Sequence, residues 1–451
     1  MRRYFLILLL FGNFINSYSQ ANFINGNIGR FNNREVRLVG FCVTKDTVLS
    51  KCMSDGNGKF VLSYPKSYSG AALVQIKEGP SIIALLNNED FSINWNNTSD
   101  SNDLQFINSK ENQLFVEGCK TNLKSQQKLK GLNYLLTLYE NEGTDIDVVE
   151  ILSNQKELQL KLLPLYIENL PSNSYAREYL RQRKVINDLQ NATLDVKFSE
   201  ELNIIFSHTN LEHFSWKNSG LLREVLDLLL KNILYISNEE SRISTYNKIS
   251  LKIINEFKQD SILFNLVSEY LLKFYEKYAL SSEAEFLALK ILGDNLCIVD
   301  SNKTPIFEQY RKMKIGNVAP ELVFDNSNAK FNKLSDIRTK YKVVVFGASW
   351  CEECKKEIPQ LKEYAELFNT SYDAKIIFVS IDTDQNSFSS FTKDLPFVTS
   401  CDFEGWEGQN VTSYYVFATP TIYIVDQNSK IVAKIYTAID AAKWLYDNTK
   451  R

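Results

Sequence analysis

One stretch of this 451-residue chain decides its fold: Val343-Val344-Val345-Phe346-Gly347-Ala348-Ser349-Trp350-Cys351-Glu352-Glu353-Cys354. Its first four residues are apolar and mostly β-branched, which is typical of a buried strand in a parallel sheet. A turn of small residues follows, and two cysteines then open a run of helix formers. The backbone N–H groups of a helix N-terminus favour the thiolate of Cys351, and the i, i+3 spacing stacks Cys354 one turn later. The pattern predicts dithiol–disulfide exchange, with Cys351 as the nucleophile and Cys354 as the resolving cysteine.

Two other uses of this cysteine pair stay open, half of a zinc site and a purely structural disulfide. A Cys-x-x-Cys zinc site needs a second pair of ligands. The chain has two histidines, His208 and His213, whose spacing takes them off a single helical face, and no other cysteine pair has short spacing. The sequence therefore favours a redox dithiol that uses no metal and no cofactor.

Further segments accompany this centre in a fixed order. The chain carries Gly316-Asn317-Val318-Ala319-Pro320, then Trp350-Cys351-Glu352-Glu353-Cys354 continued by Lys355-Lys356-Glu357-Ile358-Pro359, and then Phe417-Ala418-Thr419-Pro420-Thr421. With these segments, residues 316–451 resemble the thioredoxin superfamily, specifically the TlpA-like and ResA-like thiol–disulfide oxidoreductases of the bacterial envelope. The resemblance implies a C-terminal α/β thioredoxin-like fold and an enzyme of thiol–disulfide exchange.

The resemblance also implies where a substrate binds. Pro420 would follow a cis peptide bond that turns the backbone of Thr419 towards the cysteines, where it can pair with an extended substrate strand. Trp350 would flank the site and help to exclude water. Trp350, Thr419 and Pro420 are therefore the expected substrate-binding residues. A packing role for Trp350, and an ordinary trans proline at the start of a strand, are the alternatives.

The sequence departs from thioredoxins at two places. Thioredoxins carry a buried Asp six residues before the first cysteine, and Val345 occupies that position here. Glu357, three residues after Cys354 and on the same helical face, is the expected replacement acid and matches a Glu of ResA-like proteins. A solvated helix charge is the alternative for Glu357. Glu352 and Glu353 stand between the cysteines, where a proline commonly precedes the second one.

The N-terminus has the pattern of a secretory signal peptide. Met1-Arg2-Arg3 is basic, residues 4–11 are mostly apolar, and Ser17 and Ser19 fit a cleavage point before Gln20. The apolar core is shorter than the about 20 residues that a spanning helix needs. We therefore expect residues 1–19 to be a signal peptide and the mature chain to reach the bacterial periplasm or cell envelope without a membrane span.

Composition limits the other possibilities. A formal net charge of −3 gives no electrostatic reason to bind nucleic acid or an anionic membrane surface. Seven cysteines are too few for a scaffold built on disulfides. The chain is too long for one typical domain, so two or three are expected.

Residues 20–100 predict an all-β N-terminal domain, a small sandwich or barrel, because short strands alternate with turn residues. The expected strands are Phe23–Ile28, Glu35–Val43, Thr47–Cys52, Lys59–Tyr64, Ala71–Lys77, Ser81–Leu86 and Phe91–Trp95. This part resembles the β-rich domain of unknown function that often precedes envelope thioredoxin-like domains. Cys42 and Cys52 flank a predicted turn, so a cross-strand disulfide and two buried thiols both stay open.

Residues 101–314 predict an all-α middle domain. Apolar residues recur at helical spacing in two runs, Leu222, Val225, Leu226, Leu229 and Ile233, and Leu263, Val267, Tyr270, Leu271 and Phe274. Asp260 supplies an N-cap for the second run. Cys119 and Cys297 are expected in the helical core.

Residues 315–451 predict the thioredoxin order of elements. The expected strands are Glu321–Phe324, Tyr341–Phe346, Lys375–Ile381, Thr399–Phe403, Thr421–Val425 and Lys430–Tyr436, and the expected helices are Cys351–Phe368, Ser387–Lys393 and Asp440–Asn448. The seventh cysteine, Cys401, is expected to be a strand-buried thiol.

Together these patterns predict an exported thiol–disulfide oxidoreductase. By resemblance, it would keep protein or cytochrome-maturation thiols reduced and would receive electrons from an upstream donor protein. A thiol peroxidase is one alternative, although Val344 and Ala348 stand where a peroxidase pattern requires Pro and Thr or Ser. A non-enzymatic envelope binding module is the other.

Overall fold

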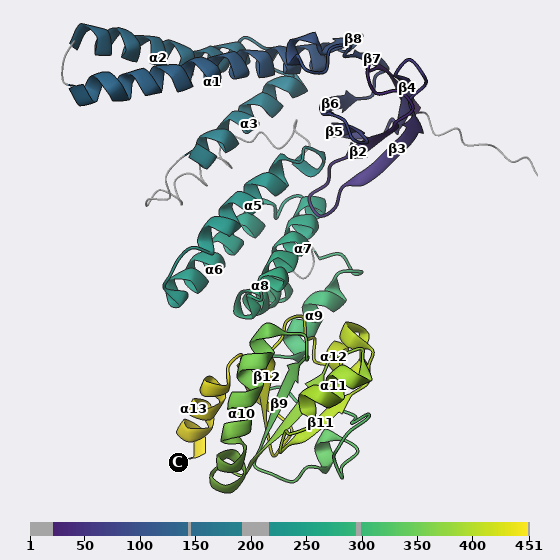
Figure 1. Cartoon of the computed structure of the whole chain (residues 1–451), viewed down its shortest axis with the longest axis vertical. Coiled ribbons are helices and arrows are strands. Elements are labelled where there is room, and N and C mark those ends of the chain that lie inside the picture. The colour runs from purple at the N-terminus through teal and green to yellow at the C-terminus, as the bar shows by residue number, and fades with distance from the viewer. Residues whose placement is uncertain (1–20, 143–145, 192–215, 295–298, 450–451) are drawn as a thin grey trace, which may run out of the picture. The chain divides into compact units, whose positions relative to one another are not determined.

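The computed structural model describes residues 21–142, 146–191, 216–294 and 299–449 (Figure 1). The chain divides into two compact units, Met1–Tyr235 and Ile236–Arg451. The expected signal peptide, residues 1–19, lies outside the described residues. The structure confirms the predicted fold class, with N-terminal β-sheets, a helical middle region and a C-terminal α/β domain.

The first unit begins with a β-sandwich. One sheet has the order β4-β1-β7-β8 and the other β3-β2-β5-β6. The strands are β1 (Ala21–Asn27), β2 (Glu35–Gly40), β3 (Thr47–Met53), β4 (Lys59–Pro65), β5 (Ser69–Ile76), β6 (Ser81–Asn87), β7 (Phe91–Asn94) and β8 (Gln105–Ile107). Alternate residues of both sheets share one apolar core, as the period of 2 predicts. The sequence predicted seven of these strands and missed β8, which is three residues long.

Helices follow the sandwich in the same unit. They are α1 (Lys110–Glu142), α2 (Ile146–Glu168), α3 (Tyr175–Asn191) and α5 (Leu221–Ile233). The buried Asn112 ties α1 to the sandwich, because its side chain accepts a hydrogen bond from the N–H of Leu85 at 2.7 Å and donates one to the carbonyl of Leu85 at 2.7 Å. Leu85 lies on β6, the edge strand of its sheet. The two hydrogen bonds with Asn112 satisfy the N–H and carbonyl groups of Leu85, which would otherwise be buried without a partner.

The cysteines of this unit depart from the predictions. Gly40 pairs with Thr47 and Val36 with Cys52, so Cys42 lies past the end of β2, about six residues along the strand direction from the position opposite Cys52. At about 3.3 Å per residue the two thiols are too far apart to be bridged, and both are free. The prediction that Cys119 is a core residue is wrong, because Cys119 is exposed on α1. Cys297 lies outside the described residues.

The second unit begins with helices α6 (Glu239–Glu256), α7 (Ser261–Lys277), α8 (Ser281–Asp294) and α9 (Thr304–Lys312). The predicted N-cap of α7 is confirmed, because the Asp260 carboxylate accepts hydrogen bonds from the N–H groups of Ile262 and Leu263 at 3.0 Å each. The apolar stripe of α7 faces the helical core, as its spacing predicted.

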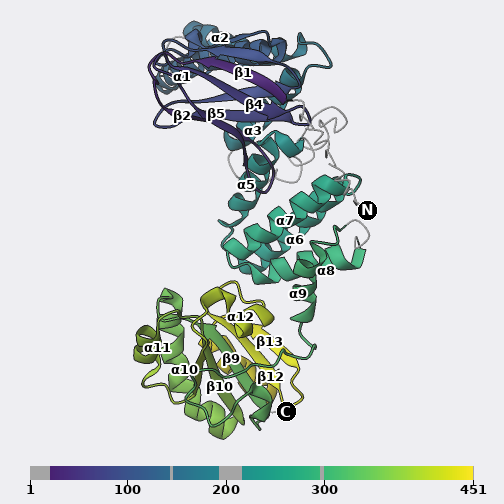
Figure 2. The same ribbon diagram turned by 90° about the vertical axis from the view of Figure 1, so that its right-hand side faces the viewer.

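A five-stranded sheet completes the second unit (Figure 2). Its order is β11-β10-β9-β12-β13, in which β9, β10 and β11 are parallel and β12 is antiparallel to both its neighbours. The strands are β9 (Tyr341–Gly347), β10 (Ala374–Ser380), β11 (Val398–Cys401), β12 (Thr421–Asp426) and β13 (Ile431–Ile435), and the helices are α10 (Glu352–Ser371), α11 (Gln385–Thr392), α12 (Gln409–Ser413) and α13 (Ala438–Thr449). The predicted buried strand is confirmed as the central one, β9, whose residues from Lys342 to Gly347 are all buried.

One prediction for this domain is wrong, and one short helix was missed. The expected strand Glu321–Phe324 is wrong, because Val323 makes only an isolated bridge to Lys333. The short helix α12 was not predicted, and Asn410 on this helix supplies the partner that a strand would have supplied. Its side chain accepts from the N–H of Val323 at 3.1 Å and donates to the carbonyl of Val323 at 2.7 Å.

Among the residues that the structure describes, no helix combines the length and the apolar character that crossing a membrane would require.

Two leucines of α10 provide a test of the core. Leu361 is fully buried, whereas Leu367 is 40% exposed on the same helix. Leu361→Ala is expected to lower the free energy of unfolding by about 2–5 kcal/mol, because it removes buried methyl groups and leaves a cavity. The matched control Leu367→Ala should change it by no more than about 0.5 kcal/mol. Pulse proteolysis in urea measures both, and equal losses would contradict this packing.

Candidate active site

Cys351 lies beyond the carboxyl end of β9 and is the N-cap residue of α10. Its Sγ accepts a hydrogen bond from the N–H of Cys354 at 3.1 Å. A sulfur therefore takes the place of the Ser or Asp oxygen that usually satisfies a free N–H group at a helix start. The residue is 7% exposed, so it is largely shielded from solvent but not completely enclosed.

Cys354 lies one turn further and is completely buried. Burial raises the pKa of the Cys354 thiol well above its ordinary value, and the hydrogen bond with Cys351 acts in the same direction. Cys354 is therefore a neutral thiol, buried one helical turn after Cys351, and it must lose a proton before it can attack a disulfide.

Gly347 makes room for this buried sulfur. A Cβ atom at this position would lie 3.2 Å from Cys354 Sγ and 2.8 Å from a ring carbon of Phe378. The position thus requires glycine because of close approach. Sequence reasoning described Gly347 only as a turn residue.

The Thr419–Pro420 peptide bond is cis, as predicted. The thiol of Cys351 lies 3.5 Å from the carbonyl oxygen of Thr419, to which it donates a hydrogen bond. The structure therefore brings together the first cysteine and the segment before the proline, which are 68 residues apart in the chain.

An exposed pair of tryptophans lies next to the dithiol. Trp350 is 53% exposed and Trp406, in the 3₁₀ turn Gly405–Glu407, is 42% exposed. Their ring centroids are 6.3 Å apart. Trp350 is thus not a core-packing residue. Trp406 is a further candidate site residue that no sequence pattern indicated, because only the fold brings it next to Trp350.

Glu357 is half-buried and its Oε2 accepts a hydrogen bond from the N–H of Ala438 at 2.6 Å. Ala438 begins α13, so this carboxylate joins α10 to the positive end of a second helix. The alternative of a fully solvated helix charge is therefore wrong. The role of Glu357 as a proton acceptor stays a prediction.

The two carboxylates between the cysteines point outward and are paired along the helix. Glu352 contacts Lys355 at 2.6 Å and Glu353 contacts Lys356 at 2.7 Å. The hydrogen bond and charge of Lys355 lower the pKa of Glu352. The two negative charges beside the dithiol are thus balanced locally by two positive ones.

Asp382 holds the loop that leads into the dithiol. It is 1% exposed, follows the end of β10, and accepts hydrogen bonds from Ser349 N–H at 3.1 Å, Ser349 Oγ at 2.7 Å and Ser380 Oγ at 2.7 Å. Three donors compensate for burying this carboxylate. Cys401, at the end of β11, donates from its Sγ to the backbone carbonyl of Asp382 at 3.3 Å. The prediction that Cys401 is a strand-buried thiol is confirmed, and burial raises its pKa.

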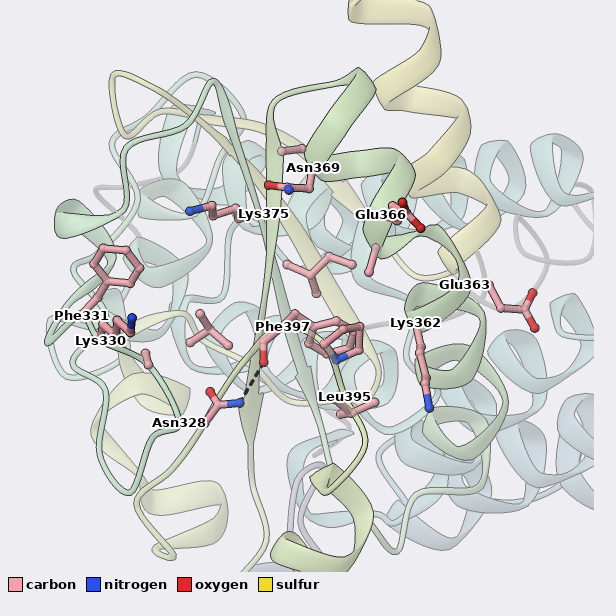
Figure 3. A pocket seen from close by; sticks show the side chains of 16 residues that line it. Asn328, Lys330, Phe331, Lys362, Glu363, Glu366, Asn369, Lys375, Leu395 and Phe397 are labelled. Carbon is pink, nitrogen blue, oxygen red and sulfur yellow. Dashed lines mark hydrogen bonds between the residues drawn. The ribbon is translucent and has the colours of Figure 1, made fainter.

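A cavity of about 660 Å³ lies away from this chemistry (Figure 3). It is lined by the start of β10 and β11, the second half of α10 and the loop near Asn328, whose side chain donates to the carbonyl of Phe397 at 3.1 Å. The dithiol follows the other end of the parallel strands. Within the described ranges, no group of three or more His, Cys, Asp or Glu side chains could hold a metal ion, and His208 and His213 lie outside these ranges.

The fold and the dithiol define a thioredoxin-like domain. Residues 339–431 match a family model described as thioredoxin-like. This match covers the strand that leads into the dithiol, the dithiol itself and the cis-proline segment. The C-terminal domain is thus a thioredoxin-like domain of the thiol–disulfide oxidoreductase class.

The curated relatives are named thiol-disulfide oxidoreductase ResA. The protein of Bacillus cereus is 29% identical over 133 residues, which are 29% of this chain and 73% of the relative. That of Bacillus subtilis is 27% identical over 146 residues, 32% of this chain and 78% of the relative. Among solved structures, a thiol-disulfide oxidoreductase from Bacteroides fragilis is 23% identical and covers 29% of this chain and 98% of its own, with a TM-score of 0.27. A thioredoxin-like protein from Bacteroides caccae covers 59% of this chain and 94% of its own, at 13% identity and a TM-score of 0.37.

The two thiols should differ sharply in alkylation. At pH 7–8 iodoacetamide should modify Cys351 in a Cys354→Ser variant, whereas Cys354 in a Cys351→Ser variant should stay unmodified on the same timescale. Because burial raises the pKa of Cys354, its modification should begin only as the pH rises well above the ordinary thiol range of about 8.5. Peptide mass spectrometry separates these sites from the other cysteines. Equal rates at pH 7.5 would contradict the assigned environments.

Proposed function

We propose that this protein is a reductase of protein disulfides that uses Cys351 and Cys354 as its redox dithiol. The observation that carries the proposal is the position of Cys351 Sγ, which contacts both the N–H of Cys354 and the carbonyl of Thr419. One sulfur is thus placed at a helix N-terminus and beside a backbone edge that can pair with a substrate. This arrangement suits attack on a disulfide in an extended chain.

The reaction proceeds in two exchanges. The Cys351 thiolate attacks one sulfur of the substrate disulfide, forms a mixed disulfide and releases the other substrate sulfur as a thiolate, which takes up a proton. Cys354 then loses its proton, attacks Cys351 and releases the second substrate thiol. The substrate gains two electrons and two protons, and the enzyme is left with a Cys351–Cys354 disulfide, which a dithiol donor protein reduces.

Glu357 is our proposed proton acceptor for Cys354. It is on the Cys354 face of α10, and Val345 replaces the buried acid of thioredoxins on β9. The hydrogen bond from Ala438 occupies Oε2, which leaves the second oxygen of the carboxylate for the proton.

Substrate binding is assigned to the residues around Cys351. The backbone of Thr419, turned by Pro420, would pair with the extended substrate strand, and Trp350 would cover the apolar side chains next to its disulfide. The exposure of Trp350 supports this role, since a core aromatic would be buried.

We also propose that the protein acts after export, in the periplasm or cell envelope. The proposal rests on the basic and apolar pattern of residues 1–19, with cleavage before Gln20. The boundaries of a β-domain at 20–100, a helical domain at 101–314 and a thioredoxin-like domain at 315–451 belong to the same proposal.

Cysteine variants test the proposal directly. With dithiothreitol as donor, Cys351→Ser should reduce insulin no faster than the donor alone, because it removes the attacking sulfur. Cys354→Ser should attack once and stay joined to its substrate, so mixed disulfides should accumulate on non-reducing gels. The matched control Cys401→Ser, which removes a buried thiol outside the pair, should keep full activity. An active Cys351→Ser with an inactive Cys401→Ser would reverse the roles, and rapid peroxide turnover by the reduced protein would favour the peroxidase alternative.

The reduction potential should be that of a reductant. Lys355 and Lys356 are paired with Glu352 and Glu353, so the positive charges nearest to the dithiol are balanced locally by carboxylates. A thiolate that is not strongly stabilised leaves the reduced state less favoured. Equilibration with glutathione should give a value close to that of thioredoxin, about −270 mV. A value near that of the oxidant DsbA, about −120 mV, would show instead an oxidase of protein thiols.

A further inference from the structure

Helices α7 and α9 contact the segment that leads into Pro420. Glu276 on α7 accepts two hydrogen bonds at one oxygen, Oε1, from the hydroxyls of Tyr310 and Tyr415, each at 2.8 Å. Tyr310 belongs to α9, and Tyr415 lies between α12 and β12. A half-buried carboxylate in the helices thus holds a residue of the thioredoxin-like domain.

The aromatic rings of this cluster also contact one another. The ring centroids of Tyr310 and Tyr415 are 4.8 Å apart in an edge-to-face arrangement, and Phe417 lies 6.2 Å from Tyr310 and 6.0 Å from Tyr415. We call Glu276, Tyr310, Tyr415 and Phe417 the clamp. Burial raises the pKa of both tyrosines and the Glu276 carboxylate raises it further, so both hydroxyls stay protonated and donate.

The backbone of the held segment is unusual. Tyr415 has φ 49°, a left-handed conformation that a bulky residue rarely adopts without outside support. Thr412 and Val411 carbonyls accept from the N–H groups of Tyr415 and Val416, at 3.2 and 3.1 Å, which fixes the turn locally. The clamp fixes the side-chain end of the same turn. Four residues after Tyr415 comes Thr419, whose carbonyl contacts Cys351 Sγ.

A third helix, α8, acts on the same segment through Lys434. Glu285 on α8 attracts Lys434 of β13, whose Nζ lies 6.0 Å from the ring centroid of Phe417 and 5.5 Å from that of Tyr423. The cation therefore covers the ring of Phe417, which is two residues before Thr419. Glu276 of α7 and Tyr310 of α9 thus contact the 415–417 segment directly, and Glu285 of α8 acts on it only through Lys434.

We propose that Glu276 is a positioning residue for substrate binding, because it holds the 415–420 segment so that the Thr419 backbone stays in register with Cys351. This inference rests on the proposed reductase function and assigns the helices α7–α9 a part in it. The clamp touches no reacting sulfur, so it should affect the pairing of an extended protein substrate and not the intrinsic reactivity of Cys351. A small disulfide that needs no backbone pairing should be insensitive to it.

Kinetics of the full chain with two disulfides test the clamp. Tyr415→Phe removes one hydroxyl and keeps the ring, and Glu276→Ala removes the shared acceptor. Both variants should raise KM for insulin roughly ten- to hundredfold, the range expected for losing a hydrogen bond to a charged group, and should leave the rate with the small aromatic disulfide DTNB unchanged. The matched control is Tyr278→Phe, since Tyr278 also stands at the end of α7 and its hydroxyl makes no hydrogen bond among the described residues. It should change neither value.

Hydrogen exchange of the 411–421 backbone provides a second readout that does not depend on catalysis. Exchange in this segment should be faster in Tyr415→Phe and Glu276→Ala than in the parent and in Tyr278→Phe. An unchanged KM for insulin, an equal loss with both disulfides, or unchanged exchange would overturn the clamp. A parent chain that reduces neither disulfide would overturn the proposed function instead, and the exchange comparison would still decide whether Glu276 holds the segment.

Discussion

The position of one sulfur atom constrains the whole C-terminal domain. Cys351 Sγ accepts the N–H of Cys354 and donates to the carbonyl of Thr419, so it connects a helix start to a distant turn. A free N–H group at a helix start needs an acceptor, and here the sulfur of Cys351 provides it. The buried strand β9 leads into the turn that carries Cys351, Gly347 leaves room for the sulfur of Cys354, and the cis bond follows Thr419, whose carbonyl Cys351 contacts. The chemistry that we propose follows from this placement.

The features that the sequence predicted correctly are local ones. A run of β-branched residues identifies β9, and an Asp before an apolar stripe identifies the start of α7. Both elements are specified by residues that are close together in the chain, so the physical cause of each can be recognised from the sequence alone. The cis bond before Pro420 was expected from the resemblance and is present in the structure. The resemblance to oxidoreductases of the thioredoxin superfamily rests on the same short segments, which is why it covers the C-terminal part alone.

The features that the sequence did not predict depend on contacts between distant residues. No sequence pattern marks Asp382 or Trp406. The fold brings Asp382 within hydrogen-bond distance of Ser349 and places the ring of Trp406 beside that of Trp350. The expected strand at residues 321–324 failed for the same reason, since Asn410 satisfies the backbone of Val323 in place of a neighbouring strand. Cys42 and Cys52 could have been bridged at another register, and the observed pairing of β2 with β3 separates them.

The complete burial of Cys354 has a consequence for the order of events in a catalytic cycle. In the proposed reductase cycle only Cys351 is available to macromolecules, so the oxidised substrate and the reducing partner would both react through this residue. The two proteins compete for the same face and cannot be bound to it together. In the proposed cycle electrons would therefore pass through the protein in alternating half-reactions, and each partner would leave before the other binds. For such a cycle, double-reciprocal plots of rate at several donor concentrations are parallel lines.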